Sequence, residues 1–166
     1  MLEEDDPEAV FWTFRNHPCT KTNPEMYGWL NVDHNDFVTS ASIKKPISTT
    51  PEKDHAIVGT FYFKKMKYFL DAVKSLYVNN NRVNNEFYVD SCAEELIKLG
   101  KKVKVFEVDH YICWGTPDDF RTYNYWQSFF HKCHWHPYEL FSDPAVDAEM
   151  IPEMNRSYSR FQQEYR

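Results

Sequence analysis

The stretch that decides the fold is His55–Phe63 (HAIVGTFYF), the strongest strand signal in the chain. Its β-branched and aromatic residues favour an extended backbone. The residues that follow, Lys64–Val78, carry apolar side chains at helical spacing: Met66, Phe69, Leu70, Val73, Leu76 and Tyr77. A strand that leads directly into an amphipathic helix is typical of α/β proteins.

On the N-terminal side of this stretch, the pattern predicts three more strands. Ala9–Phe14 (AVFWTF) is a short apolar run and is expected to be a buried strand. Met26–Asp33 and Phe37–Ile43 are strand-like runs joined by a polar turn, which indicates a hairpin. Arg15–Glu25 holds two prolines and two asparagines, and is therefore predicted to be a loop.

On the C-terminal side, the pattern predicts a second helix over Glu86–Leu99, which Gly100 ends. Strands are expected at Val103–Val108 and, more briefly, at Tyr111–Trp114. Pro117 then opens a further helix, because proline suits a first turn and the two aspartates after it complement the helix dipole. The whole order predicts an α/β fold with a mixed sheet and flanking helices.

Composition and charge limit the classes of protein to consider. The chain has 166 residues and a net charge of −6, without a basic stripe, which argues against a nucleic-acid partner. No apolar run approaches the roughly 18 residues of a membrane span. The four cysteines lie far apart without a C-x-x-C pair, and the start is not a signal peptide, so a cytoplasmic protein is expected.

Three regions are expected along the chain. Residues 1–8 form an acidic lead-in, residues 9–133 a single α/β domain, and residues 134–166 a proline-containing tail with a short helix near Tyr158–Tyr165. The chain holds only four glycines, and the closest pair, Gly100 and Gly115, is 15 residues apart. This excludes a glycine-rich phosphate loop within the chain.

Two groups of residues could bind a small ligand. Lys44, with Lys45 and Pro46, follows a strand and could meet an anion, although a solvated loop charge is the commoner role. Glu86 and Asp90 are four residues apart, so a helix would place both carboxylates on one face. Spacing alone favours two solvated carboxylates over a shared site.

The cysteines and histidines are weaker candidates. His131, Cys133, His134 and His136 match no reliable zinc spacing, and packing against the core is the favoured interpretation. Cys113 and Cys133 lie among aromatic residues, which favours buried, inert thiols over nucleophiles.

Five motifs occur in an order that resembles the sugar-phosphate nucleotidyltransferases, and among them the capsule- and surface-polysaccharide members with a W-G-T-P-x-D motif. The likeness covers roughly residues 9–136. The motifs are MYGWLNVD (26–33), SIKKPIS (42–48), HAIVGTFYF (55–63), NNEFYVD (84–90) and CWGTPDDF (113–120).

The resemblance implies transfer of a nucleotidyl group from a nucleoside triphosphate to a sugar phosphate, with Mg²⁺ and release of pyrophosphate. It implies a Rossmann-like three-layer α/β domain, of which this chain would be the C-terminal, acceptor-binding half. The glycine-rich triphosphate loop belongs to the other half. A complementary N-terminal half, or a second copy covering an open strand edge, is therefore an expected partner. The alternative is a non-catalytic sugar-phosphate-binding or assembly module, for which the aromatic-rich residues 111–141 would form the interface.

The same resemblance assigns roles to individual residues. It places Gly28 where the backbone approaches the sugar, Lys44 at the sugar phosphate, Val58 and Gly59 along the sugar pocket, and Glu86 at sugar hydroxyls, with Asp90 close by. Cys113 takes the position of the family's second metal-binding aspartate. Because a thiol is a poor ligand for Mg²⁺, no metal ligand is identified in this chain.

Overall fold

The computed structural model describes residues 6–133, 135, 139–144 and 146–160. The chain divides into two compact units, Met1–Tyr111 and Ile112–Arg166, and each is described by itself. Among the described residues, the first unit holds five strands and three α-helices, and the second holds two α-helices. Within the described residues, no helix is long and apolar enough to cross a membrane.

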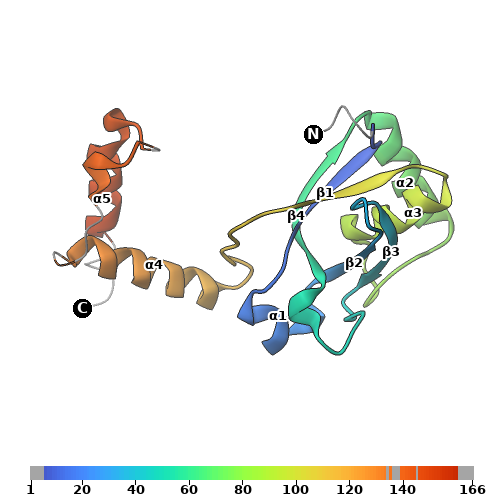
Figure 1. Ribbon diagram of the computed structural model, residues 1–166, viewed down its shortest axis with the longest axis horizontal. Helices are drawn as coiled ribbons and strands as arrows, with labels where there is room; N and C mark the ends of the chain where they lie inside the picture. Colours follow the sequence, from blue (N-terminus) through green and yellow to red (C-terminus); the bar gives the residue numbers. More distant parts are fainter. Residues whose placement is uncertain (1–5, 134, 136–138, 145, 161–166) are drawn as a thin grey trace. The chain divides into compact units, whose positions relative to one another are not determined.

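A five-stranded mixed sheet is the frame of the first unit. Its strands are β1 (Ala9–Phe14), β2 (Gly28–Val32), β3 (Val38–Ile43), β4 (His55–Phe63) and β5 (Val103–Glu107). They lie in the order β3-β2-β4-β1-β5 (Figure 1). β1 pairs with β5 in parallel, and the other pairs are antiparallel. The predicted α/β class with a mixed sheet and flanking helices is thereby confirmed.

The central strand β4 pairs with β2 on one side and β1 on the other. Its register against β1 shifts between Phe11, which faces Phe61, and Thr13, which faces Ile57. Three residues of β4 therefore lie opposite Trp12 alone. Gly59 is in the middle of this bulge with a φ of +101°, a conformation that glycine adopts most readily.

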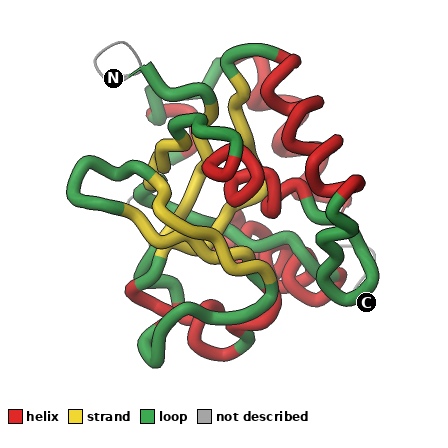
Figure 2. Tube along the Cα trace, turned by 90° about the vertical axis from the view of Figure 1, so that its right-hand side faces the viewer, coloured by secondary structure: helices red, strands yellow, loops and turns green. Residues whose placement is uncertain are grey.

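The helices are α1 (Pro18–Thr22), α2 (Met66–Val78), α3 (Cys92–Lys98), α4 (Pro117–Lys132) and α5 (Ile151–Arg160). α2 and α3 cover one face of the sheet (Figures 1 and 2). The core between them contains Ala9, Phe11, Leu30, Ile57, Ala72, Leu76, Cys92, Ala93, Leu96 and Val103. Burying these apolar side chains is the main driving force for this arrangement.

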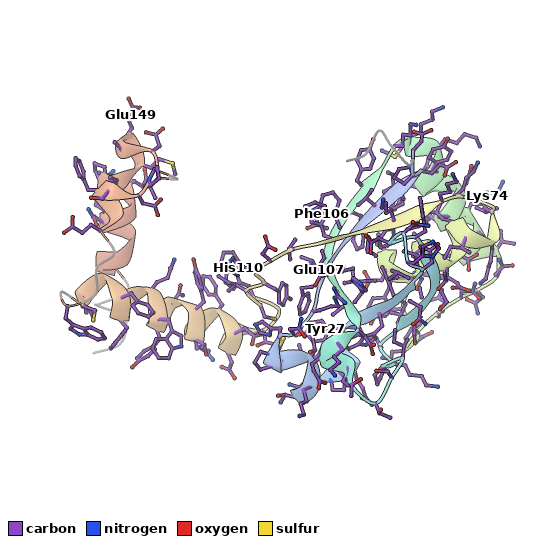
Figure 3. All side chains as sticks on the ribbon, in the orientation of Figure 1. Tyr27, Lys74, Phe106, Glu107, His110 and Glu149 are labelled. Atoms are coloured by element: carbon purple, nitrogen blue, oxygen red, sulfur yellow. The ribbon has the colours of Figure 1, made fainter. Side chains whose placement is uncertain are left out.

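A second, smaller cluster covers the opposite face at the end that carries α1. It consists of Phe14, Tyr27, Trp29 and Ala56, with Cys19, Ile47, Val58, Val108 and Tyr111 packed against them. Figure 3 shows Tyr27 at this end of the sheet. The ring of Tyr111 stacks on that of Phe14, with 3.8 Å between centroids.

Both outer edges of the sheet are partly covered by the chain itself. At β5, the backbone N–H of Val105 donates to the carbonyl of Asp36 in the β2–β3 turn, at 3.0 Å. At β3, the backbone N–H of Ala41 donates to the Glu94 carboxylate on α3, at 3.1 Å. Unpaired backbone N–H and C=O groups on an edge strand can bind a strand of another molecule. These two contacts reduce the number of such groups.

Two predictions about helices are wrong. Arg15–Glu25 contains the helix α1, because Pro18 takes its first position and the His17 ring accepts the backbone N–H of Cys19 at 3.2 Å. The predicted helix over Glu86–Leu99 begins only at Cys92. Asn84 and Asn85 have positive φ angles of 49° and 64°, so the backbone before α3 turns instead of winding.

The predicted apolar face of α2 is correct only in part. Phe69 and Leu76 pack against the core, whereas Met66, Leu70 and Tyr77 are more than half exposed. Ala72, which the pattern did not single out, is fully buried. A small side chain at this position lets the helix approach the sheet closely.

Residues 111–114, predicted as a strand, form none. In the second unit, α4 begins as predicted, with a capping box between Thr116 and Asp119. α5 starts before the predicted position of Tyr158–Tyr165, and residues 161–165 lie outside the described part of the chain.

A buried carboxylate ties α2 to α3. Glu95 is 1% exposed and accepts hydrogen bonds from Ser75, from Asn81 at 2.8 Å and from Lys98 at 3.0 Å. Burial alone would raise the pKa of Glu95, but the three hydrogen bonds outweigh it and hold the pKa below its ordinary value of 4.5. The ionised form is therefore the one that stabilises the fold.

Replacing Glu95 with Gln should lower the free energy of unfolding by about 2 kcal/mol at neutral pH, since the charge is lost and an amide N–H₂ takes the place of one of the two oxygens that accept these hydrogen bonds. Because the folded pKa is depressed, this contribution is present above about pH 4.5 and is lost as the pH falls through the folded pKa. Urea unfolding over a pH series measures it. The exposed Glu25→Gln serves as the control, and an equal effect of both variants would contradict the role given to Glu95.

Candidate functional site

Three residues that lie far apart in the sequence come together at one end of the β2–β3 hairpin: Gly28, Lys44 and Asp90. Gly28 begins β2 and is paired with Ile43, so Lys44 follows directly beside it. A Cβ atom on Gly28 would lie 2.6 Å from Asp90 Oδ2. Only a residue without a side chain leaves room for this carboxylate at the strand.

Lys44 is held firmly at the end of β3. Its φ angle is +61°, a left-handed conformation that is uncommon for a lysine. Its backbone N–H donates to the carbonyl of Tyr27 at 3.0 Å, and its Nζ donates to the carbonyl of Met26 at 2.5 Å. A strained backbone conformation persists only where the surrounding contacts hold it in place. At Lys44, the backbone N–H and the side-chain ammonium are both bound to the segment Met26–Tyr27.

Asp90 lies in the 3-10 turn Val89–Ser91, immediately before α3. Its side chain is half-buried, and burial raises its pKa above the ordinary value, while the positive charge of Lys44 acts in the opposite direction. No side chain of another described residue donates a hydrogen bond to this carboxylate. A partly buried carboxylate without such a donor lowers the stability of the fold when it is ionised. Ionisable groups that lower stability are common in binding sites.

Tyr88 links Lys44 to Glu86. Lys44 Nζ lies 5.3 Å from the centroid of the Tyr88 ring, within the range of a cation–π contact. The Tyr88 hydroxyl donates to Glu86 Oε2 at 2.6 Å, and this bond is the main cause of a raised Tyr88 pKa. The sequence reasoning missed Tyr88, because nothing in the run FYV separates it from an ordinary core aromatic residue.

The predicted pairing of Glu86 and Asp90 on one helical face is wrong. Glu86 closes a tight turn with Val83, where the two residues exchange backbone hydrogen bonds of 3.0 and 2.9 Å, and Asp90 belongs to the separate turn before α3. Glu86 is connected to the other site residues through the Tyr88 hydroxyl.

Val58 and Gly59 are placed elsewhere. Val58 packs in the cluster with Phe14 and Trp29, on the face of the sheet away from α2 and α3. Gly59 lies in the bulge of β4, where an added Cβ would have no neighbour within 4 Å. The structure therefore groups Gly28, Lys44, Glu86 and Asp90, and leaves Val58 and Gly59 outside this group.

The donor set around Cys113 does not fit Mg²⁺. Its Sγ lies 3.5 Å from Asp119 Oδ2, and this carboxylate already accepts two hydrogen bonds from Thr116. The Thr116 hydroxyl, chiefly, holds the pKa of Asp119 below its ordinary value. Among the described residues, no group of three or more His, Cys, Asp or Glu side chains is suited to a metal. His134 and His136 lie outside the described part of the chain.

The sequence matches none of the family models and none of the curated proteins with which it was compared. Among solved structures, it is similar to a nucleoside-diphosphate-sugar pyrophosphorylase from Vibrio cholerae RC9. The TM-score is 0.58 at 20% identity, over 71% of this chain and 46% of that one. It also matches a CMP:2-keto-3-deoxy-manno-octonic acid synthetase complexed with CTP, with a TM-score of 0.49 at 14% identity, over 78% and 53% of the two chains.

The chain therefore spans about half the length of each of these structures. At 20% identity, the likeness to the pyrophosphorylase shows the fold and nothing finer. The shared fold is a mixed sheet flanked by helices.

Gly28→Ala should destabilise the protein by about 2 kcal/mol, because the new methyl group must displace the Asp90 carboxylate or the Ile57 side chain. The cost should shrink when Asp90 is also Ala, and a double-mutant cycle measures this coupling. Gly59→Ala is the control: its strain comes from the backbone, so Asp90→Ala should leave its cost unchanged. Purely additive effects of Gly28→Ala and Asp90→Ala would refute the contact.

Asp90→Asn should make the protein more stable at neutral pH, by about 1 kcal/mol. A carboxyl group with a raised pKa binds its proton more tightly when folded, so its ionisation lowers stability as the pH rises from 3.8 through the folded pKa. The gain from Asp90→Asn should therefore disappear in acid. Thermal unfolding followed from pH 3 to pH 7 tests this, and a gain independent of pH would contradict it.

Proposed function

We propose that this chain binds a sugar phosphate as the acceptor side of a nucleotidyl transfer, in the synthesis of surface-polysaccharide precursors. The observation that carries the proposal is the convergence of Gly28, Lys44 and Asp90 at one end of the sheet. A cation and a carboxylate held close together are groups that recognise a phosphorylated polyol. The nucleotidyltransferase-like fold and the order of the sequence motifs support the same function.

Each residue has a distinct role in this proposal. The Lys44 ammonium neutralises the phosphate, and it is already directed by the Met26 carbonyl and the Tyr88 ring. Asp90 accepts hydrogen bonds from sugar hydroxyls, which suits a carboxylate that no other described side chain binds. Gly28, which has no side chain, leaves the room beside β2 that the Asp90 carboxylate occupies. Glu86, bound to the Tyr88 hydroxyl, lies further out and can accept a second hydroxyl.

The proposal covers acceptor binding only. The 166 residues hold no glycine-rich loop, so binding of the nucleoside triphosphate is not assigned to them. The donor set at Cys113 likewise supports no metal-dependent step. In a nucleotidyl transfer, the contribution of this site would be to orient the phosphate oxygen of the acceptor and to neutralise its charge.

Binding of glucose 1-phosphate, mannose 1-phosphate and inorganic phosphate, measured by calorimetry, tests the proposal. Lys44→Ala should weaken binding of the preferred sugar phosphate by about tenfold or more, the loss expected for a charge-assisted contact. The adjacent Lys45→Ala is the matched control, because Lys45 is exposed and makes no side-chain contact in the described structure.

Asp90→Asn should weaken the binding of the sugar phosphate but leave the binding of inorganic phosphate unchanged, since the proposal assigns the carboxylate to the sugar hydroxyls. Equal losses for Lys44→Ala and Lys45→Ala, or no binding of any of the three compounds, would overturn the proposal. Release of pyrophosphate from a triphosphate by the purified chain would show that it also catalyses the transfer.

A further inference from the structure

A cysteine, a histidine and a tyrosine meet at the α1 end of the sheet, apart from the sugar-phosphate site. The Sγ atom of Cys19 lies against Nδ1 of His17. The hydroxyl of Tyr27 donates to the same sulfur at 2.9 Å. Cys19 is partly buried, in contrast to the completely buried Cys92.

The hydrogen bonds define the role of the His17 ring. Nδ1 accepts the backbone N–H of Cys19 at 3.2 Å, so Nδ1 is the nitrogen that carries the lone pair. The Cys19 sulfur lies 2.6 Å from this same nitrogen, within reach for a proton transfer. When the proton moves to Nδ1, that nitrogen gives up the backbone hydrogen bond, while the thiolate keeps the hydrogen bond from Tyr27 and gains the positive charge of the imidazolium beside it.

Aromatic packing keeps this base in position. The imidazole of His17 lies edge-on to two rings, with centroids 5.9 Å from Phe14 and 5.6 Å from Tyr111. These two rings are stacked on each other and anchored in the buried cluster. His17 is also the N-cap of α1, which fixes its backbone two residues before the cysteine.

The other cysteines have different surroundings. Burial, above all, raises the pKa of the Cys92 thiol to about 12, and Cys92 is completely inaccessible. Cys113 has a carboxylate oxygen of Asp119 at 3.5 Å instead of a base nitrogen. Cys133 ends α4, where its backbone N–H donates to the carbonyl of Phe130. Among the four, the described structure places only the Cys19 thiol against an imidazole.

We propose that Cys19 is a nucleophilic thiol and a modification site for small electrophiles and low-molecular-weight disulfides, with His17 as its base and Tyr27 as the donor to its sulfur. With a disulfide, the thiol proton passes to His17 Nδ1 and the thiolate attacks one sulfur. A new disulfide forms to Cys19, and the old S–S bond breaks. The departing thiolate takes the proton from His17, so that no further oxidant is needed.

Alkylation by iodoacetamide at neutral pH, with peptide mapping over time, tests the inference on the intact chain. Cys19 should react about tenfold faster than Cys113 and Cys133, and Cys92 should not react while the protein is folded. Glutathione disulfide should form a mixed disulfide at Cys19 first. Cys19→Ser should remove the fast phase in both experiments.

Two variants separate activation from mere exposure. His17→Asn removes the base but retains a side chain that can begin a helix, and Tyr27→Phe removes only the donor hydroxyl. Each should slow the reaction of Cys19 several-fold without changing that of Cys113. Circular dichroism confirms that both remain folded. If Cys19 reacts no faster than Cys113, or if both variants leave its rate unchanged, the inference is wrong.

Discussion

The pairing of β4 with both β1 and β2 is the constraint on which the rest of the structure depends. Because β4 pairs with β2 along one edge and with β1 along the other, the β2–β3 hairpin lies on one side of it, and β1 with β5 on the other. The alternation of side chains along β4 then separates two clusters. Ile57 faces α2 and α3, while Ala56 and Val58 face the cluster that includes α1.

The short segment Met26–Gly28 connects the two sites. Its backbone carbonyls accept both hydrogen bonds of Lys44, and Gly28 leaves room for Asp90. The side chain of Tyr27 points to the other cluster, where its hydroxyl meets Cys19. Successive residues of an extended chain face opposite sides, so one segment can serve a polar site on each face of the sheet.

Strands β1 to β5, the β2–β3 hairpin and helix α2 could be predicted because local patterns determine them. These patterns are alternation along a strand, residues that favour turns and apolar residues at helical spacing. The candidate site was reachable in part. Gly28, Lys44 and Asp90 were named from the motifs, but their contact depends on how α3 packs against the sheet. Glu86 and Asp90 were expected on one helix, whereas positive φ angles at Asn84 and Asn85 turn the chain before α3 begins. Tyr88 and the Cys19–His17 pair carried no signal of their own.

The sequence by itself determined the fold class, the central strand, the absence of a glycine-rich loop among these residues and the positions of strands β1 to β5. Each of these is a matter of composition or of neighbours within a few residues. Only the tertiary structure decided which face each residue occupies: Asp90 beside Gly28, and Val58 on the opposite side of the sheet. The reason is that side-chain direction follows from strand register and helix docking, which arise from contacts between residues distant in the sequence.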